Sequence, residues 1–358
     1  MVNKNKKKWF YYALFAIVAL LIMASISDEE INTFAFTPQE EEKNSPKPED
    51  LSLELLNKAN RLPAKINYKP YEIPLAYPTQ HFFDGNICNH DEIRTDYKPS
   101  LKKALKRLSV QYKHHTYLIS DHIELNLYAT KMTDFFEQEL INRIGVLHRE
   151  YIKLLGASAK RSIRLHLVIT PERVDYEQYL SFYANSFADS FADTIGVYLS
   201  GLNIAYVDYQ GSDTKALSTA IHETVHAFNA HIIGETPPMF NEGMAELYEN
   251  LRIKDDKISI ILSTAQLAQA PLPLMQFFDA QQWSSLDIQH LYYSSWAWVT
   301  FMFNDTQGIQ SLISFMKQEQ INPCSAFSAG ESYEIFQEQS PMFEPAFYHW
   351  QQTLNTPD

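Results

Sequence analysis

Cysteine is scarce in this sequence, because the 358-residue chain has only two, Cys88 and Cys324. His90 follows Cys88 closely, but this pair supplies at most half of a structural zinc site, and Cys324 has no histidine near it. A disulfide between the two thiols would need an oxidising compartment, and the two residues could equally be buried and free. The sequence therefore argues against a cysteine-based metal centre and leaves the disulfide open.

Positive charge is also in short supply. Lysine and arginine total 30 against 43 aspartates and glutamates, which gives a net charge of −13. Proteins that bind nucleic acid neutralise phosphates with a basic patch, so we expect no nucleic-acid partner. The apolar content of 45%, with 22 Phe and 21 Tyr, instead predicts a folded globular domain.

Several lysines gather at the N-terminus, directly before a long apolar run. Residues 9–26 carry no charge and are just long enough to cross a bilayer. Lysines before this run and Asp28 after it orient the rest of the chain to the outer side. We expect residues 1–27 to be an uncleaved signal anchor, with a signal peptide cleaved near 25–27 as the alternative. The protein would then be membrane-anchored with its domain on the extracytoplasmic side (periplasmic if bacterial), or secreted after cleavage.

Three further regions follow this segment. Residues 28–50 are acidic and proline-bearing, which is typical of a solvated linker. Residues 51–109 form an N-terminal extension with several prolines, and it ends in a basic amphipathic stretch at 101–108. Residues 110–358 carry the regular hydrophobic patterns of a folded domain.

Within that domain, strand-like and helix-like patterns alternate first, and a run of helices follows. Alternating apolar residues predict strands at 122–128 and 163–170, and a hairpin over 196–209 that turns at Ser200 and Gly201. Helical spacing is found at residues 132–155, 175–190, 215–233, 241–252, 292–304 and 309–318. This order predicts an α+β fold in which a small mixed β-sheet packs on a mainly helical layer.

The segment Ala220–Phe228 reads AIHETVHAF and carries the clearest chemical motif. On a helix, His222 and His226 lie one turn apart on the same face, so both imidazoles can reach one ion. Glu223 is rotated by about 100° from His222, which places its carboxylate beside the metal, where it can accept a proton from a bound water.

A second helix would supply the third ligand that a hydrolytic zinc site needs. After Pro237 the chain reads PMFNEGMAELYE, and Glu242 stands at the start of this predicted helix. Gly243 and Ala245 are small, so we expect them to let the second helix approach the first. Glu246 lies one turn beyond Glu242 on the same face.

The pair HETVH and NEGMAELYE resembles the gluzincins, the thermolysin-like zinc metallopeptidases, and in particular their peptidase-MA-like branch. The resemblance implies a zincin-type metallopeptidase domain, one Zn²⁺ ion and a peptide or protein substrate. It makes His222, His226 and Glu242 the metal ligands and Glu223 the general base, and it gives orienting roles to Asn241 for His226 and to Glu246 for His222. The aromatic residue before the second-helix glutamate is Phe240, and it departs from that branch's usual pattern in type and spacing.

Relatives of this branch also place a tyrosine or histidine near the zinc from a later helix. Tyr292 is the first candidate for stabilising the oxyanion, and Tyr293 is the second. Residues 202–207 are a candidate edge strand for an extended peptide. The metzincin pattern requires a third histidine six residues after His226, and position 232 is Ile. We expect His231 to be a surface or capping residue, and His114 and His115 to be surface residues.

Two other functions stay open at this point. One is a catalytically silent zincin-fold binding protein, although all three ligands and the base are present. The other is a zinc hydrolase that acts on a non-peptide amide of the cell envelope. A membrane-tethered scaffold without metal is a weaker third alternative.

Overall fold

The computed structural model describes residues 111–183, 194–200, 202–254, 257–260, 270–279, 288–339 and 341–354. The predicted membrane segment (1–27), the acidic linker (28–50), the extension (51–109) with its stretch at 101–108, and Cys88 all lie outside the described residues. Cys324 is exposed, and its pairing with Cys88 stays a prediction. None of the helices in the described part of the chain is long and apolar enough to cross a membrane.

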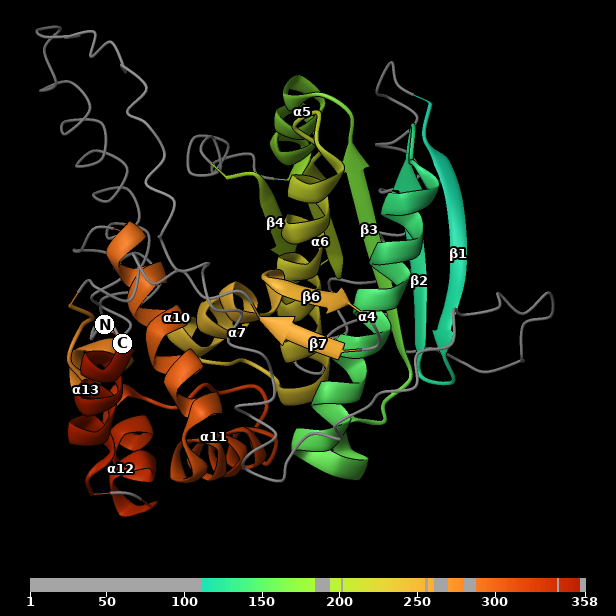
Figure 1. Ribbon diagram of the computed structural model, residues 1–358. Coiled ribbons are helices and arrows are strands. Elements are labelled where there is room, and N and C mark those ends of the chain that lie inside the picture. The colour runs from blue at the N-terminus through green and yellow to red at the C-terminus, as the bar shows by residue number, and fades with distance from the viewer. Residues whose placement is uncertain are drawn as a thin grey trace, which may run out of the picture. The chain divides into compact units, whose positions relative to one another are not determined.

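A five-stranded mixed sheet forms one layer of the domain (Figure 1). Its order is β1-β2-β3-β5-β4, with bounds Lys113–Ser120 (β1), Ile123–Ala129 (β2), Ile163–Thr170 (β3), Ile204–Asp208 (β5) and Gly196–Leu199 (β4). The three central strands are parallel, and each outer strand is antiparallel to its neighbour. The predicted small mixed sheet in an α+β fold is therefore confirmed.

The edges of this sheet differ from the prediction in two ways. The prediction that residues 202–207 form an edge strand is wrong, because β5 lies between β3 and β4. The outer strand on this side of the sheet is β4. The hairpin that joins them turns through Asn203, whose φ of 52° is left-handed, a conformation that asparagine tolerates better than most residues. At the other edge, β1 was not predicted. His114 is exposed on it and stacks on Tyr128 of β2 at 4.4 Å.

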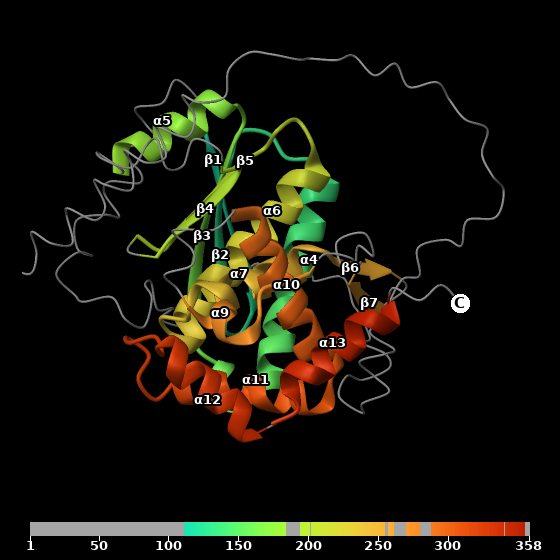
Figure 2. The same cartoon turned by 90° about the vertical axis from the view of Figure 1, so that its left-hand side faces the viewer.

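Helices cover both faces of the sheet (Figure 2). Helices α4 (Asp134–Leu155) and α6 (Asp213–Phe228) lie on one face, and α5 (Arg173–Tyr183) lies on the other. Thr133 caps α4 by accepting from the Phe136 N–H at 3.0 Å, and Ser212 caps α6 by accepting from the Lys215 N–H. These caps fix where each helix begins, and so fix the register of α6 on the sheet.

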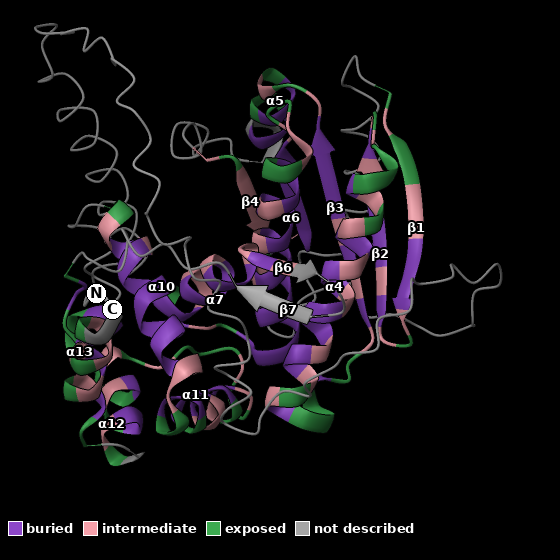
Figure 3. Cartoon of the chain, in the orientation of Figure 1, coloured by how far each residue is buried: buried purple, intermediate pink, exposed green. Residues whose placement is uncertain are grey.

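The second layer is helical and lies beside the sheet. It contains α7 (Pro238–Glu249), α9 (Leu274–Phe278), α10 (Ile288–Asn304), α11 (Thr306–Glu319), α12 (Ala329–Gln339), α13 (Phe343–Leu354) and the hairpin of β6 (Leu251–Lys254) and β7 (Lys257–Ile260). Its core is aromatic, with Phe240 stacked on Phe315 at 4.4 Å and Trp298 on Phe347 at 3.8 Å. Figure 3 shows the buried residues running through α10 and the central strands, while the outer faces of α11 and α12 are exposed.

Gly243 has a different role from the predicted one. A Cβ atom at this position would lie 2.5 Å from the Ser295 carbonyl oxygen of α10. The missing side chain therefore lets α7 approach α10, and the expectation that Gly243 serves the contact with the first helix of the motif is wrong.

Candidate metal centre

Helix α6 carries the HETVH motif beneath a cleft. The imidazole rings of His222 and His226 have centroids 4.8 Å apart and lie almost perpendicular to each other. The α-helix ends at Phe228 and continues as a π-helical turn, Asn229–Ile233. Gly234 then reverses the chain with a φ of 127°, which glycine alone adopts easily. Pro238, whose missing N–H costs nothing in the first turn, begins α7.

The reversal brings Glu242 of α7 against the two histidines of α6. Its Oε2 atom lies 3.4 Å from Nε2 of His222 and 3.5 Å from Nε2 of His226. These distances are long for hydrogen bonds, and Oε2 is buried with no hydrogen-bond partner in the described part of the chain. Ligands about 2.0–2.1 Å from a tetrahedral zinc ion lie about 3.3–3.4 Å from one another. The Glu242 oxygen is thus spaced from both histidine nitrogens as two ligands of one zinc ion would be, and all three atoms lie within 4.8 Å of one another.

The other ring nitrogen of His222 is held by a residue that the sequence did not indicate. Nδ1 lies 3.1 Å from Oε2 of Glu249, three residues beyond the predicted partner Glu246. With the Nδ1 proton donated to this carboxylate, the Nε2 lone pair is left for a metal. Burial opposes the charged imidazolium, but the adjacent carboxylates of Glu242 and Glu249 outweigh burial and raise the pKa of His222. A metal ion at Nε2 would take the place of the proton that these carboxylates favour. Glu246 belongs to a second group with His222 and Glu249, whose possible ligand atoms also lie within 4.8 Å of one another.

A chain of amides and a phenol ends beside His226, whose Nδ1 atom is buried without a hydrogen-bond partner among the described residues. Asn241 lies beside it, as the resemblance implied, and opposes the lowering of the His226 pKa that burial causes. The Asn241 Oδ1 atom also accepts from Asn229 Nδ2 at 2.9 Å, and Asn229 Oδ1 accepts from the Tyr151 hydroxyl at 2.5 Å. Tyr151 is completely buried in α4. The position of Asn241 is therefore fixed from the core of the domain.

Ionisation of the candidate ligand Glu242 is favoured by its surroundings. Burial alone would raise the pKa of its carboxyl, but the neighbouring His226 and His222 outweigh burial and lower it. An ionised carboxylate next to two neutral imidazole nitrogens is the donor set of hydrolytic zinc sites. The residues at this position therefore fit a zinc ion in chemistry as well as in spacing.

Glu223 is nearly buried, with 4% of its surface exposed, and lines the cleft beside the histidines. Burial raises the pKa of its carboxyl to about 8, although His222 and the Tyr198 backbone N–H of β4 act in the opposite direction. Its Oε2 atom has no hydrogen-bond partner among the described residues. A Cβ atom on Gly196 would lie 2.5 Å from Oε1, so the glycine in β4 leaves the space that the carboxylate occupies.

The two tyrosine candidates have different surroundings. Tyr292 of α10 lines the cleft, and its hydroxyl donates to the Glu242 carboxylate, which contributes to the low pKa of Glu242. Burial and the nearby carboxylates, Glu242 first among them, raise the pKa of Tyr292, so its hydroxyl stays protonated and can donate. Tyr293 is also buried, but its hydroxyl accepts from Gln351 of α13 at 3.4 Å, and its ring lies 6.3 Å from that of Trp296. Of the two, only Tyr292 lines the cleft.

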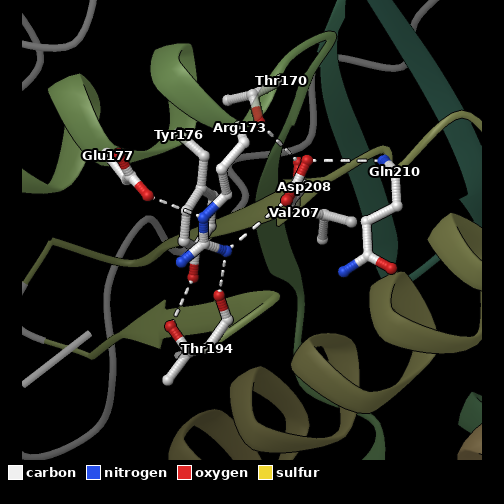
Figure 4. A network of polar contacts seen from close by, with 8 residues as sticks. All are labelled: Thr170, Arg173, Tyr176, Glu177, Thr194, Val207, Asp208 and Gln210. Carbon is white, nitrogen blue, oxygen red and sulfur yellow. Dashed lines mark hydrogen bonds and ion pairs between the residues drawn. The ribbon is translucent and has the colours of Figure 1, made fainter. Parts of the chain in front are cut away.

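The cleft has a volume of about 890 Å³ and runs between β4 and the helical layer. The start of β4 is held by a polar network drawn in Figure 4. Arg173 of α5 donates to the Thr194 carbonyl oxygen at 2.5 Å and pairs with Glu177 at 2.9 Å. The Tyr176 hydroxyl lies 2.8 Å from Thr194 Oγ1, and the Asp208 N–H donates to the Ile195 carbonyl oxygen at 2.8 Å. The strand beside Glu223 is therefore fixed at its first residues.

His231 corrects one prediction. It is 2% exposed rather than on the surface, and its Nε2 lies 2.8 Å from Oδ1 of Asn203 in the β4–β5 turn. Tyr198 donates to the same oxygen at 3.0 Å. The π-helical turn inserts an extra residue per turn, which changes the direction in which His231 projects. The hydrogen bond between His231 and Asn203 thereby links the end of α6 to the β4–β5 hairpin.

In comparisons with known proteins, no protein-family model matches this sequence, and no curated protein sequence is significantly similar to it.

Proposed function

We propose that this chain is a zinc-dependent metallopeptidase of the gluzincin type. The observation that carries the proposal is the placement of two imidazole nitrogens at 3.4 and 3.5 Å from one carboxylate oxygen of Glu242. Glu223 stands next to this group with an unpartnered oxygen in the cleft. In this proposal His222, His226 and Glu242 hold the metal, and Glu223 is the general base.

A zinc ion bound by this set would lower the pKa of a coordinated water towards about 7 and polarise the scissile carbonyl. Glu223 accepts the proton of the attacking water and delivers it to the amide nitrogen as the carbon–nitrogen bond breaks. Burial of Glu223 favours the protonated carboxyl, which is the form that it takes after it accepts the water proton. The Tyr292 hydroxyl, which donates to Glu242 in this structure, would instead donate a hydrogen bond to the carbonyl oxygen as negative charge develops on it, and it would keep its proton.

The edge strand β4 supports binding of an extended substrate. Just before the first pair of the β4–β5 register, Gly196 with Val207, the Asp208 N–H donates to the Ile195 carbonyl oxygen. In an antiparallel pair such residues alternate with residues whose backbone groups point away from the partner, which here are Gly196 and Tyr198, and the Tyr198 N–H is directed to the Glu223 carboxylate. A peptide can add to this edge as a further strand, beside Glu223 and the candidate ligands.

We also propose that the domain works outside the cytoplasm, tethered by residues 1–27. The support is the order of a lysine cluster, an apolar run at 9–26 and an acidic linker. This part of the proposal is independent of the metal centre.

Chelator-sensitive cleavage of a peptide library by the purified protein tests the function. We expect cleavage that is lost with a strong chelator and restored by zinc. Zinc binding without any cleavage would contradict the peptidase proposal and would favour a silent binding protein or a hydrolase of another amide. Cleavage that survives complete removal of metal would contradict the mechanism.

A further inference from the structure

The cleft carries far more negative charge than a metal site needs. Among the described residues no lysine or arginine lines it. The five glutamates that do so are Glu223, Glu235, Glu242, Glu246 and Glu249. In the proposed function Glu223 and Glu242 are used by the chemistry, and Glu249 holds His222. Glu246 and Glu235 have no part in the reaction as described.

Glu246 is the most informative of these residues. It lies one helical turn beyond Glu242 on the cleft side of α7, and no lysine or arginine pairs with its carboxylate among the described residues. His222 lies near it, but the imidazole lowers the pKa of Glu246 by less than burial and Glu249 raise it. Burial and the charge of Glu249 raise its pKa to about 7. A partly buried carboxylate is unfavourable unless a cation or hydrogen-bond donors compensate it. The compensation that this position lacks can come from a bound molecule.

Two large apolar side chains are exposed where they line the cleft. Ile195 and Ile288 are 43% and 56% exposed, respectively, and Ser200, Glu235 and Ala326 are the other exposed lining residues. The side chains of lysine and arginine place a long aliphatic stem on an apolar surface and direct a charged end to a polar one. A cleft that combines glutamates with exposed isoleucines therefore matches such a side chain better than it matches an acidic or a purely apolar one.

We infer that the cleft selects peptides with an ammonium or guanidinium group close to the scissile bond, and that Glu246 receives this group. The inference rests on the proposed peptidase function and adds the substrate class to it. The cation can be a lysine or arginine side chain or the free amino terminus of a short peptide, since the chemistry of recognition is shared.

Matched peptides test this inference with the zinc-loaded full-length protein. One pair differs only in lysine against norleucine next to the scissile bond, and each peptide is made with a free and with an acetylated amino terminus. We expect kcat/KM to be about tenfold higher for lysine or for the free terminus, and the gain to shrink at high salt. Whichever of the two changes produces the gain identifies the source of the cation. Equal kcat/KM for all four peptides would overturn the inference.

Variants assign the selectivity to a residue. Glu246→Gln should bring the ratio between charged and neutral peptides close to one. Glu338→Gln makes the same change in net charge on the exposed side of α12 and should leave the ratio unchanged. A ratio that survives in Glu246→Gln would overturn the assignment to Glu246. If this variant does not fold, the ratio measured with the unmodified protein still decides the charge preference.

Direct binding separates this inference from the peptidase proposal. Fluorescence anisotropy with labelled lysine and norleucine peptides requires no turnover. Tighter binding of the lysine peptide, by about tenfold, without cleavage would contradict the peptidase proposal and support the charge preference. Cleavage of both peptides with equal affinity would support the peptidase proposal and contradict the charge preference.

Discussion

The two faces of helix α7 illustrate two different demands on one element. On one face Phe240, Met244 and Tyr248 are almost fully buried among aromatic side chains. On the other face Glu242 and Glu246 line the cleft, where the pKa of Glu246 is raised and that of Glu242 is lowered. The first face stabilises the helix through burial of apolar surface, and the second places charged groups where they are unfavourable for stability.

The difference between these faces separates folding from chemistry. Aromatic packing against α9, α10 and α11 can hold α7 in place while its other face carries carboxylates near two histidines. Changes on the core face should therefore lower stability, and changes on the cleft face should lower activity or metal binding with little loss of stability. Each prediction below tests one side of this separation.

The largest expected effect is on activity, for Glu223→Gln. Removal of the general base should lower kcat/KM for peptide cleavage by roughly 10²–10⁴-fold, because no other carboxylate stands in its position. Zinc content and the thermal unfolding temperature should stay close to those of the unmodified protein. Retained cleavage, measured with a fluorogenic peptide at saturating zinc, would contradict the role of Glu223.

The next effect is on stability, for Phe240→Ala. Phe240 lies on the core face and stacks against Phe315 and Phe336 at 4.4 and 5.7 Å. Removing its ring should lower the free energy of unfolding by about 3–5 kcal/mol, through lost burial and a residual cavity. Urea unfolding monitored by circular dichroism measures this loss. Below the unfolding temperature the folded variant should still bind zinc, and loss of the metal from a folded variant would break the separation.

A smaller effect is expected for Gly196→Ala. The added methyl group would stand 2.4 Å from Cγ2 of Thr219 and 2.5 Å from Oε1 of Glu223, so both side chains, or the strand between them and solvent, must move. A displacement of about 1 Å in a catalytic group can lower the rate by up to roughly 10²-fold, and we expect a loss of about 10–100-fold in kcat/KM. Gly145→Ala is the matched control, since its Cβ would have its nearest neighbour at 3.5 Å, away from the cleft. Unchanged activity in Gly196→Ala would show that the added methyl group does not displace the Glu223 carboxylate.

The smallest effect concerns pH and Glu319, a carboxyl buried outside the cleft. Burial raises the pKa of Glu319 to about 7, against the hydrogen bond from the Phe327 N–H. Between about pH 4.5 and 7 the folded state thus holds a proton that the unfolded state has lost, and stability falls as pH rises. Glu319→Gln should raise the unfolding temperature more at pH 8 than at pH 5. Equal shifts at both values, measured by differential scanning calorimetry, would contradict this assignment.

Much of the fold could be predicted from local patterns. Strand β3 matches the predicted residues 163–170, and β4 and β5 both lie within residues 196–209, for which a hairpin was predicted. These segments have clear alternation or turn residues, so the local signal agrees with the tertiary contacts. Strand β1 was missed because its first residues, Lys113 to His115, are polar and only half-buried or exposed at the edge of the sheet.

The candidate site could be predicted where it depended on helical spacing, and it could not where tertiary contacts decide. Helical spacing predicted that His222 and His226 share a face, and the start of the next predicted helix indicated Glu242; the three ligand atoms do lie within 4.8 Å of one another. Glu249 follows Glu242 by seven residues on the same face, so spacing alone could have indicated it. The burial of His231 depends on a π-helical turn and on the β4–β5 hairpin, and no local pattern encodes these.

The central claim is the metal centre, and metal stoichiometry tests it most directly. Elemental analysis of the purified protein, after exposure to zinc and removal of the excess, should find one zinc ion per chain. The same measurement should find it retained in Glu223→Gln and lost in His226→Ala and Glu242→Gln. Absence of zinc from the unmodified protein, or full retention in both ligand variants, would contradict the account.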